Sequence, residues 1–474
     1  MRVKKSVSIR RFDETNSEKF PHMLSCYNYY ASGKLYNSRG VRVARFPKTT
    51  TDLSELELNI QGAGIAKVDG LTYFKQYVAS SNVSTHRLLV HSTDGRLFIN
   101  QMFYGVDGLV HLYNLRFENP PITLSFKQDD LDAIILTDKK EMFVWATGYS
   151  PYKISGVPVI TSMCMNEGVL FCTLKDPAFK IWYATDLNAE NVGNIDKNSG
   201  YISLEDDLGY ARKILTFNEN VYVFRDYGIT KVSFYKNTVS TTEIYQSNTM
   251  IFSNSVSVCG NKILFATRDG LYSFNGGSVS KVKIDMLDNI DFVNSKLACA
   301  SLGDEYYMSA KMNFLDGEKV LCENGEYTNN ALIIIDINNL SCEVIRGVDI
   351  GSMLPLKTEV FEKMLVTFNS MHDNTIGEIV DLSVCCDEVL PKCWLSGDLV
   401  EDRNVKLFNK LTVESKKGVD FTIIYDDKEL TFTTYCDGVN EFRFQAIGKK
   451  VSLKIYSVEP DAMVDTVVLD YYDY

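Results

Sequence analysis

Short apolar runs alternate with polar turns along most of the chain. In the stretch Ile263–Gly277, ILFATRDGLYSFNGG, an apolar run ends at Ala266, Arg268-Asp269-Gly270 follows, and a second apolar run returns to Phe274. Runs of this length suit buried strands, and a glycine in the turn accepts positive φ at no steric cost. The pattern predicts a β-hairpin.

The same plan recurs along the sequence, with turns near residues 95, 139, 177, 228, 270, 338 and 374. Most intervals are close to the roughly 40–50 residues that a four-stranded propeller blade needs. The longest interval contains the polar stretch Leu315–Asn329, which we expect to be a surface loop. The repeat predicts an all-β fold: a degenerate β-propeller of six or seven blades, which buries both faces of each blade against its neighbours. A pair of β-sandwiches or an irregular β-solenoid would use the same hairpins without closing a ring.

From about Pro391 the turns come closer together. Six alternating strands are expected between Val405 and Tyr474, separated by polar turns that include Asp426-Asp427 and Gly448-Lys449. This density is typical of a small β-sandwich with one core. We therefore divide the chain into residues 1–80, an N-terminal strand or arm able to complete the propeller; residues 81–385, the β-propeller; and residues 391–474, the C-terminal β-sandwich. Trp394 is expected to pack where the last two meet.

Composition and charge narrow the class of protein. The chain has 474 residues, of which 45% are hydrophobic and 12% aromatic, enough for a packed core. The formal charge of −12 argues against a protein whose main task is to grip nucleic acid, because such binding needs Lys and Arg at the phosphates. No run approaches the roughly 18 apolar residues of a membrane span. The basic start MRVKKSVSIRRF continues into Asp13, Glu14 and Glu18 rather than into the apolar core of a signal peptide.

The cysteines suggest reduced core thiols. Their number, eleven, is odd, no CxxC pair occurs, and most stand in apolar runs. Cys385, Cys386 and Cys393 form the only cluster, and no histidine stands at the sequence spacing of a zinc site. We expect no metal and no cofactor.

Catalytic signatures are missing from the sequence. None of the five histidines has a partner four residues away, and no GxSxG, GxxxxGK[ST], GxGxxG or HExxH occurs. The acid pairs Asp129-Asp130, Asp206-Asp207 and Asp426-Asp427 read as solvated turn residues, because neighbours on a strand point to opposite faces. Calcium binding at Asp206-Asp207 is the lesser alternative. The WD, kelch and sialidase signatures of other propellers are absent as well. We expect a protein that is not an enzyme.

Aromatic residues are the candidate contact residues. Tyrosines gather at residues 27–30 and at the C-terminal end of the sequence, and such clusters commonly mark protein contacts or sugar-stacking platforms. The candidates for a subunit interface or a glycan contact are Tyr27, Tyr29, Tyr30, Trp182, Trp394, Tyr471 and Tyr472.

Two segments carry a resemblance to bacteriophage tail proteins. FPHMLSCYNYYASGKLYNSRGVRVAR (residues 20–45) resembles the opening of these proteins, in which an assembly segment precedes a strand with Arg-Gly-Val or Pro-Gly-Val. VKLFNKLTVES, followed by FRFQAIGKKVSLKIYSVEPDAMVDTVVLDY, is similar to the sandwich that follows their propeller, where a late Gly-Lys-Lys or Gly-Arg-Arg hairpin recurs. With the propeller between them, the layout resembles that of tail hub or nozzle proteins of phages and prophages.

The resemblance implies a structural virion protein. It would form a homo-oligomeric ring, commonly of six copies in short-tailed phages, in the conduit between portal and tail tip. Its partners would be other tail, portal or adaptor proteins, and DNA would pass through during genome ejection without specific binding. It would be assembled in the cytoplasm of the host bacterium and reside in the phage tail. The alternative is a receptor-binding baseplate protein whose propeller recognises host cell-wall glycan, with Tyr27, Tyr29, Tyr30 or Trp182 as stacking platforms.

Overall fold

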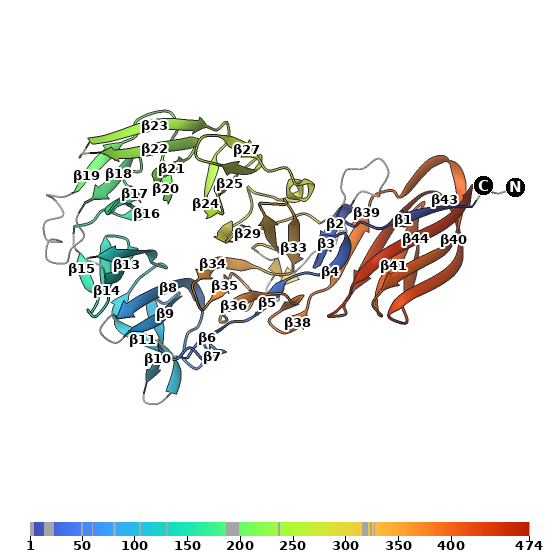
Figure 1. The fold of residues 1–474 in the computed structure, drawn as a ribbon, viewed down its shortest axis with the longest axis horizontal. Helices are drawn as coiled ribbons and strands as arrows, with labels where there is room; N and C mark the ends of the chain where they lie inside the picture. Colours follow the sequence, from blue (N-terminus) through green and yellow to red (C-terminus); the bar gives the residue numbers. More distant parts are fainter. Residues whose placement is uncertain are drawn as a thin grey trace.

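In the part of the chain that the structure describes, seven largely antiparallel sheets stand around a ring, and another large sheet extends from one side of it (Figure 1). The computed structural model describes residues 4–13, 23–48, 51–58, 60–78, 82–103, 106–128, 131–154, 156–185, 199–235, 238–314, 321–322, 325–326 and 328–473. The fold is an all-β, seven-bladed β-propeller with a nearly closed, barrel-like C-terminal sheet. No helix in the described ranges is long and apolar enough to span a membrane.

The first five blades are built from strands consecutive in the sequence. Blade 1 contains β8 (Val68–Val78), β9 (Val83–Ser92), β10 (Arg96–Phe103) and β11 (Val106–Arg116). Blade 2 contains β12 (Ile122–Gln128), β13 (Leu131–Asp138), β14 (Glu141–Ala146) and β15 (Tyr152–Ile154). Blade 3 contains β16 (Ile160–Asn166), β17 (Val169–Leu174), β18 (Lys180–Ala184) and β19 (Ser199–Ser203). Blade 4 contains β20 (Ala211–Phe217), β21 (Asn220–Arg225), β22 (Gly228–Tyr235) and β23 (Thr238–Gln246). Blade 5 contains β24 (Ile251–Cys259), β25 (Lys262–Thr267), β26 (Gly270–Phe274) and β27 (Val279–Lys281), followed by a 3-10 turn, η2 (Asp285–Asn289).

The last two blades depart from this order. Blade 6 contains β28 (Ala298–Leu302), β29 (Glu305–Ala310), β32 (Ala331–Asp336) and β33 (Cys342–Arg346), with the small pair β30 (Leu321–Cys322) and β31 (Gly325–Glu326) inserted between β29 and β32. Blade 7 contains β34 (Ile350–Lys357), β35 (Glu362–Phe368), β36 (Gly377–Val380) and, from the N-terminal part of the chain, β5 (Gly40–Val43). On its outer side β5 also contacts β37 (Val384–Cys385), which pairs with β38 (Glu388–Val389). Blade 7 therefore joins two distant parts of the sequence. A small separate sheet, β6 (Arg45–Pro47) and β7 (Glu55–Glu57), follows β5.

Each predicted hairpin lies in a different blade, which confirms the propeller. In ILFATRDGLYSFNGG, β25 and β26 pair from Ile263↔Phe274 to Thr267↔Gly270, and Gly270 has a φ of +131°. The long interval before residue 338 has two causes. The insertion separates β29 from β32, and the hairpin recognised in blade 6 joins its third and fourth strands, whereas in the first five blades it joins the second and third. Most of the expected loop 315–329 lies outside the described residues.

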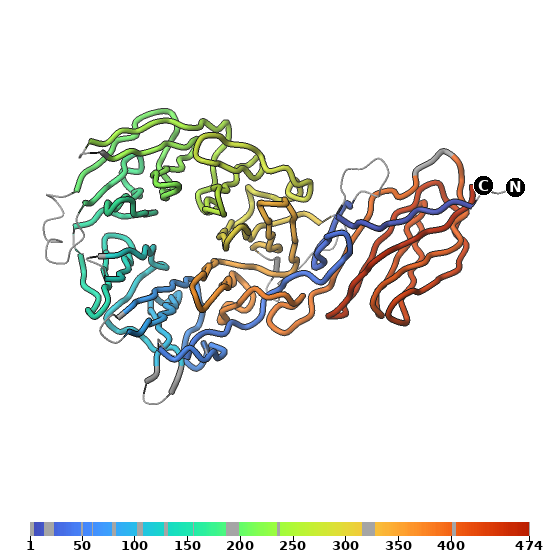
Figure 2. Tube along the Cα trace, viewed as in Figure 1, coloured from blue at the N-terminus to red at the C-terminus, as the bar shows by residue number. Residues whose placement is uncertain are grey.

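The C-terminal sheet is assembled from both ends of the chain. It contains β39 (Lys392–Ser396), β40 (Val400–Ser415), β41 (Asp420–Tyr425), β42 (Lys428–Thr433), β43 (Gly438–Ser457) and β44 (Val464–Asp473). To these it adds β1 (Lys4–Ile9), β2 (Met23–Tyr27), β3 (Tyr29–Ser32) and β4 (Lys34–Asn37). Segment 1–80 is thus split, because β1–β4 join this sheet, β5 completes blade 7, and β8 already belongs to blade 1. Figure 2 shows the N-terminal trace running from this sheet to the propeller.

The expected turn at Gly448-Lys449 is wrong. β43 runs without a break for 20 residues; its first part pairs with β40 and its last part with β39 and β41. The strand bends from one layer to the other near Gly448, where the Lys449 amide donates to the Asp426 carboxylate at 3.0 Å. A side chain at Gly448 would lie 3.1 Å from that carboxylate. A bend and a hairpin turn use the same residue types, so the sequence pattern does not separate them.

One apolar cluster runs from the C-terminal sheet into blades 5 and 6 and includes Trp394, Tyr306 and Leu264. Trp394 is fully buried, packs edge-on against Phe12 at 5.2 Å, and donates its indole N–H to the Phe12 carbonyl. Separate clusters fill the spaces within and between the other blades. The continuous core indicates that the sheet and the propeller are packed as one body.

Candidate functional site

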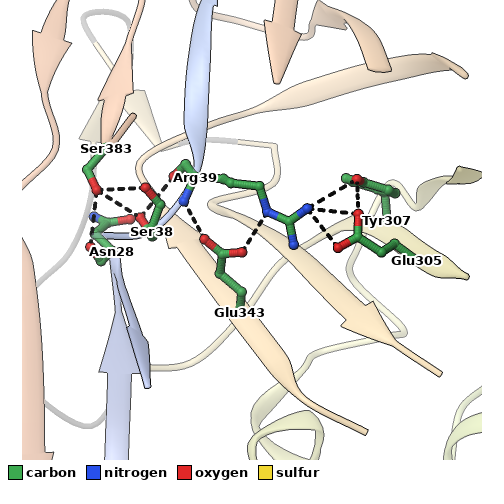
Figure 3. Close-up of polar contacts among 7 residues, drawn as sticks. All are labelled: Asn28, Ser38, Arg39, Glu305, Tyr307, Glu343 and Ser383. Carbon is green, nitrogen blue, oxygen red and sulfur yellow. Dashed lines mark hydrogen bonds and ion pairs between the residues drawn. The ribbon is translucent and has the colours of Figure 1, made fainter. Parts of the chain in front are cut away.

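The chain passes between the propeller and the C-terminal sheet twice. The first crossing runs from Asn37, at the end of β4, to Gly40, at the start of β5. The second runs from Val389, at the end of β38, to Lys392, at the start of β39. Polar side chains gather around both crossings, and we take this junction as the candidate site (Figure 3).

Asn28 links the C-terminal sheet to blade 6 and to the second crossing. It lies between β2 and β3 with a φ of +57°, a left-handed conformation that asparagine tolerates better than most residues. Its side-chain amide donates to the carbonyls of Arg346 (3.2 Å) and Pro391 (2.7 Å), and its Oδ1 accepts from the Arg346 amide (2.8 Å). The Asn28 amide donates to the Val344 carbonyl. The side chain is buried, so these bonds form away from water.

Arg39 joins the first crossing to two strands of blade 6. Its Nε donates to Glu343 Oε2 at 2.8 Å, and its backbone amide donates to the other oxygen of the same carboxylate. Its Nη1 donates to both oxygens of Glu305, at 2.8 and 2.9 Å, and to the Tyr307 hydroxyl at 3.3 Å. Figure 3 shows the guanidinium between the two carboxylates. The planar fork of arginine suits such multiple contacts, which a lysine could not reproduce.

Two serines complete the junction. The hydroxyl of Ser383, which precedes β37, lies 3.2 Å from the hydroxyl of Ser38 and donates to the Ser38 carbonyl at 2.9 Å. Both side chains are buried. Ser383 thus links the first crossing to the segment that precedes β37, and its carbonyl accepts a hydrogen bond from the amide of Leu390 in the second crossing.

Burial and charge act in opposite directions on these groups. Burial alone would lower the pKa of Arg39, but the negative charges of Glu343 and Glu305 outweigh it and raise that pKa. Burial raises the pKa of Glu343 against the opposing influence of Arg39. Burial, together with the hydrogen bond to Glu305, also raises the pKa of Tyr307. The positive charge of the Arg39 guanidinium offsets the free-energy cost of burying the Glu343 carboxylate.

Two cavities of about 360 Å³ flank the junction. Tyr30 lines both. The first extends along Tyr29 and Cys26 toward η2. The second is acidic: its wall includes the carboxylates of Glu305, Glu343, Asp336 and Asp381, with Arg39 beside them. Because Arg39, Glu305 and Glu343 are already bonded to one another, the arrangement is suited to holding two parts of the chain together.

Four of the seven predicted contact residues are buried. Tyr27, Tyr29, Trp182 and Trp394 are all at most 2% exposed, so the expectation that they stack on a glycan or meet a neighbouring subunit is wrong. Each fills a core instead: Tyr27, for example, packs against the Phe314 ring and under the Arg346 guanidinium. Burying a large aromatic side chain is more favourable than exposing it. A cluster of aromatic residues in the sequence does not show whether they pack in the core or lie on a contact surface.

The other three remain partly accessible. Tyr30 stands between the two cavities, whereas Tyr471 and Tyr472 lie in β44, at the far end of the C-terminal sheet where both termini lie (Figure 1). Tyr471 packs against Phe408. The structure therefore places the predicted residues in three different regions. Tyr27, Tyr29 and Tyr30 lie near the junction, as does Trp394, whose strand pairs with β2.

In the described residues, one member of each of two acid pairs, Asp206 and Asp426, is bonded to protein partners. Asp206 pairs with Arg225, whose side chain is fully buried, and accepts a hydrogen bond from the Leu208 amide. Asp426 accepts the amides of Lys449 and Lys450 at the bend of β43. Asp129-Asp130 lies outside the described residues. These contacts account for Asp206 and Asp426 without a calcium ion.

Sequence reasoning missed Asn28, Arg39, Glu305 and Glu343. Arg39 stands 304 positions from Glu343 and 266 from Glu305, and each is an ordinary surface-type residue in its own segment. The only available signal was that Asn28 and Arg39 fall inside the segment that resembles phage tail proteins.

No protein-family model and no curated protein matches the sequence. Among solved structures, streptogramin B lyase is similar over 72% of this chain and 97% of its own, at 8% identity and a TM-score of 0.45. BBS1N, from its complex with ARL6DN, is similar over 67% of this chain and 93% of its own, at 11% identity and a TM-score of 0.43. The extracellular domain of a one-component system from B. thetaiotaomicron is similar over 94% of this chain and 61% of its own, at 11% identity and a TM-score of 0.45.

Proposed function

We propose that this chain is a structural subunit of a bacteriophage tail, a hub, nozzle or head-tail conduit protein that forms a ring around the path of the ejected DNA. The observation that carries the proposal is the junction: the C-terminal sheet is built from both ends of the chain and fixed to the propeller by two crossings and a buried polar network. The segment that resembles tail proteins contains both Asn28 and Arg39.

A fixed junction suits a part that bears load. Domains joined by one exposed linker move relative to each other by default, and a large apolar interface is needed to prevent it. Here a continuous core and the bonds of Arg39 and Asn28 hold the sheet against blade 6. A subunit of a ring under internal pressure needs this property, because any change of angle would open the contacts with its neighbours.

The C-terminal sheet offers an edge for those neighbours. In the described residues, the first part of β43 pairs only with β40, which leaves its other edge free. Its outward-pointing residues alternate with buried ones and include Val439 and Ile447, which are 59% and 51% exposed. Unpaired edges and exposed apolar residues favour contacts with another chain. In the proposed ring this edge meets the adjacent copy.

The negative charge is consistent with a conduit. A lining of net negative charge repels DNA phosphates, so the genome would pass without adhering. The formal charge of −12 supplies such a field if the acidic side chains face the channel.

Electron microscopy of the purified full-length chain, alone and in phage particles, tests the proposal. We expect closed rings with a channel wide enough for duplex DNA. The double variant Val439→Lys, Ile447→Lys should abolish the rings without changing the thermal midpoint of the monomer. Val258→Lys, on an exposed valine of β24, is the matched control and should leave the rings intact. A stable monomer that binds host cell-wall glycan would refute the conduit and favour the receptor-binding alternative.

A further inference from the structure

Three metal-binding side chains meet on the outer side of blade 7. His372 lies in the connection between β35 and β36, Cys385 ends β37, and Cys386 follows it. One ligand atom from each lies within 4.8 Å of the other two. Cys393, the third member of the cysteine cluster expected from sequence, is instead buried in β39. The histidine that the sequence spacing did not provide is thus supplied by the fold.

The backbone places both thiols on the same side. Adjacent residues of a regular strand point to opposite faces, so neighbouring cysteines would normally face apart. Cys386 instead has a φ of +46° and His372 a φ of +50°, in the left-handed region that is uncommon for non-glycine residues, although histidine enters it more often than most. Such conformations cost free energy and tend to occur at functional positions. Here they turn Cys386 and His372 toward Cys385.

We propose that His372, Cys385 and Cys386 form a zinc site whose fourth position is open to water. Two thiolates and an imidazole are ligands that Zn²⁺ prefers, whereas Mg²⁺ and Ca²⁺ require oxygen ligands. Tetrahedral zinc-ligand bonds of about 2.0–2.3 Å space the ligand atoms about 3.5 Å apart. The three atoms now lie within 4.8 Å of one another, so each pair would approach by at most about 1.3 Å on binding. Binding releases the remaining thiol protons, and the two thiolates balance the charge of the ion.

The position of the site gives it a structural consequence. Cys385 pairs with Val41 of β5, and the Cys386 amide donates to the Val41 carbonyl at 2.7 Å. A bound ion would connect the two cysteines that contact β5 to the loop that carries His372. Zinc would therefore help to keep the N-terminal strand in blade 7 and the ring closed.

Metal analysis of the full-length chain, purified with a reductant and without chelator, provides the first test. We expect about one zinc per chain, and loading with Co²⁺ should produce the strong near-ultraviolet absorption of thiolate coordination. His372→Asn preserves a residue that tolerates positive φ, and Cys386→Ser removes one thiolate. Each should weaken zinc affinity at least tenfold. Cys436→Ser, on an exposed cysteine of the C-terminal sheet, is the matched control and should bind like the unmodified chain.

Thermal unfolding with and without zinc provides a second readout. Zinc should raise the thermal midpoint of the unmodified chain and of Cys436→Ser, but not that of His372→Asn. The proposal is overturned if the reduced chain binds no zinc at micromolar concentration, or if zinc shifts the midpoint of His372→Asn as much as that of the unmodified chain. Copper as the retained metal would overturn the assignment to zinc.

Discussion

Lys392 makes the stability of this protein depend on pH in a way that one substitution should remove. It begins β39 at the second crossing, its side chain is fully buried, and its ammonium donates to the Glu459 carbonyl at 2.5 Å. Burial lowers its pKa from the ordinary 10.5 to about 8, although Asp461 and Glu459 act in the opposite direction. The folded protein therefore binds this proton less tightly than the unfolded chain does.

The size and sign of the effect follow from that difference. Below pH 8 the lysine is protonated in both states, and the folded state carries the full cost of the buried charge. The difference of about 2.5 in pKa corresponds to about 3 kcal/mol, at about 1.4 kcal/mol for each factor of ten. Between pH 8 and 10.5 the folded state loses the proton first, so this cost disappears as the pH rises.

Lys392→Met removes the charge and keeps a long, flexible side chain. It also leaves the Glu459 carbonyl without this donor, which costs about 1 kcal/mol at every pH. We expect the variant to be more stable than the unmodified chain by about 2 kcal/mol at pH 7, and to lose this advantage by pH 10.5. The cost of the buried charge and the cost of the lost hydrogen bond together predict that the stability difference between the variant and the unmodified chain changes sign between pH 7 and 10.5.

Urea unfolding followed by tryptophan fluorescence at pH 7, 8, 9 and 10.5, with a reductant present, measures the difference. Buried thiols and tyrosines such as Cys342 and Tyr307, whose pKa values burial raises, lower the stability of both proteins as the pH rises and cancel in the comparison. Lys428→Met, on exposed β42, is the matched control. A stability difference that stays constant from pH 7 to 10.5 would refute the reasoning.

Three further predictions concern the junction and the ring. Arg39→Ala leaves Glu343 buried beside an empty position and should lower the free energy of unfolding by about 2–4 kcal/mol, less than for a fully buried pair because the Arg39 side chain is 23% exposed. Arg45→Ala, which breaks the exposed pair with Glu57, should cost at most about 1 kcal/mol in the same urea titration. Equal losses would contradict the stabilising role of Arg39 at the junction. Gly40→Ala places a methyl group 2.2 Å from the Val384 carbonyl and should destabilise the closure of blade 7 by about 1–3 kcal/mol or more. The loss should be seen as faster hydrogen exchange in β5. Gly277→Ala, whose added methyl group has its nearest neighbour at 3.9 Å, should leave that exchange unchanged. Residues 391–474 expressed alone should lack the circular dichroism of a folded sheet because β1–β4 are missing. Joining residues 1–39 to this fragment should restore that signal. If residues 391–474 fold alone, the N-terminal strands are not required for the C-terminal sheet.

The sequence by itself determined the hairpins and therefore the propeller. A hairpin depends on an apolar run, a turn residue and an apolar return that are all adjacent, as in Ile263–Gly277, so local chemistry is sufficient to specify it. Repetition at blade spacing then required the sheets to stack, because one blade cannot bury both of its faces alone. The strands β40, β41, β42 and β44 of the C-terminal sheet were recognisable for the same reason, whereas β43 was predicted as two strands.

Only the tertiary structure decided what joins these units. The pairing of β1–β4 with the C-terminal strands, the insertion of β5 into blade 7 and the contact of Arg39 with Glu343 connect residues hundreds of positions apart. His372 approaches Cys385 and Cys386 only because blade 7 brings the connection between β35 and β36 close to the end of β37. Such contacts depend on which distant chain segments lie next to each other in the folded protein, and a local pattern of polar and apolar residues does not specify this.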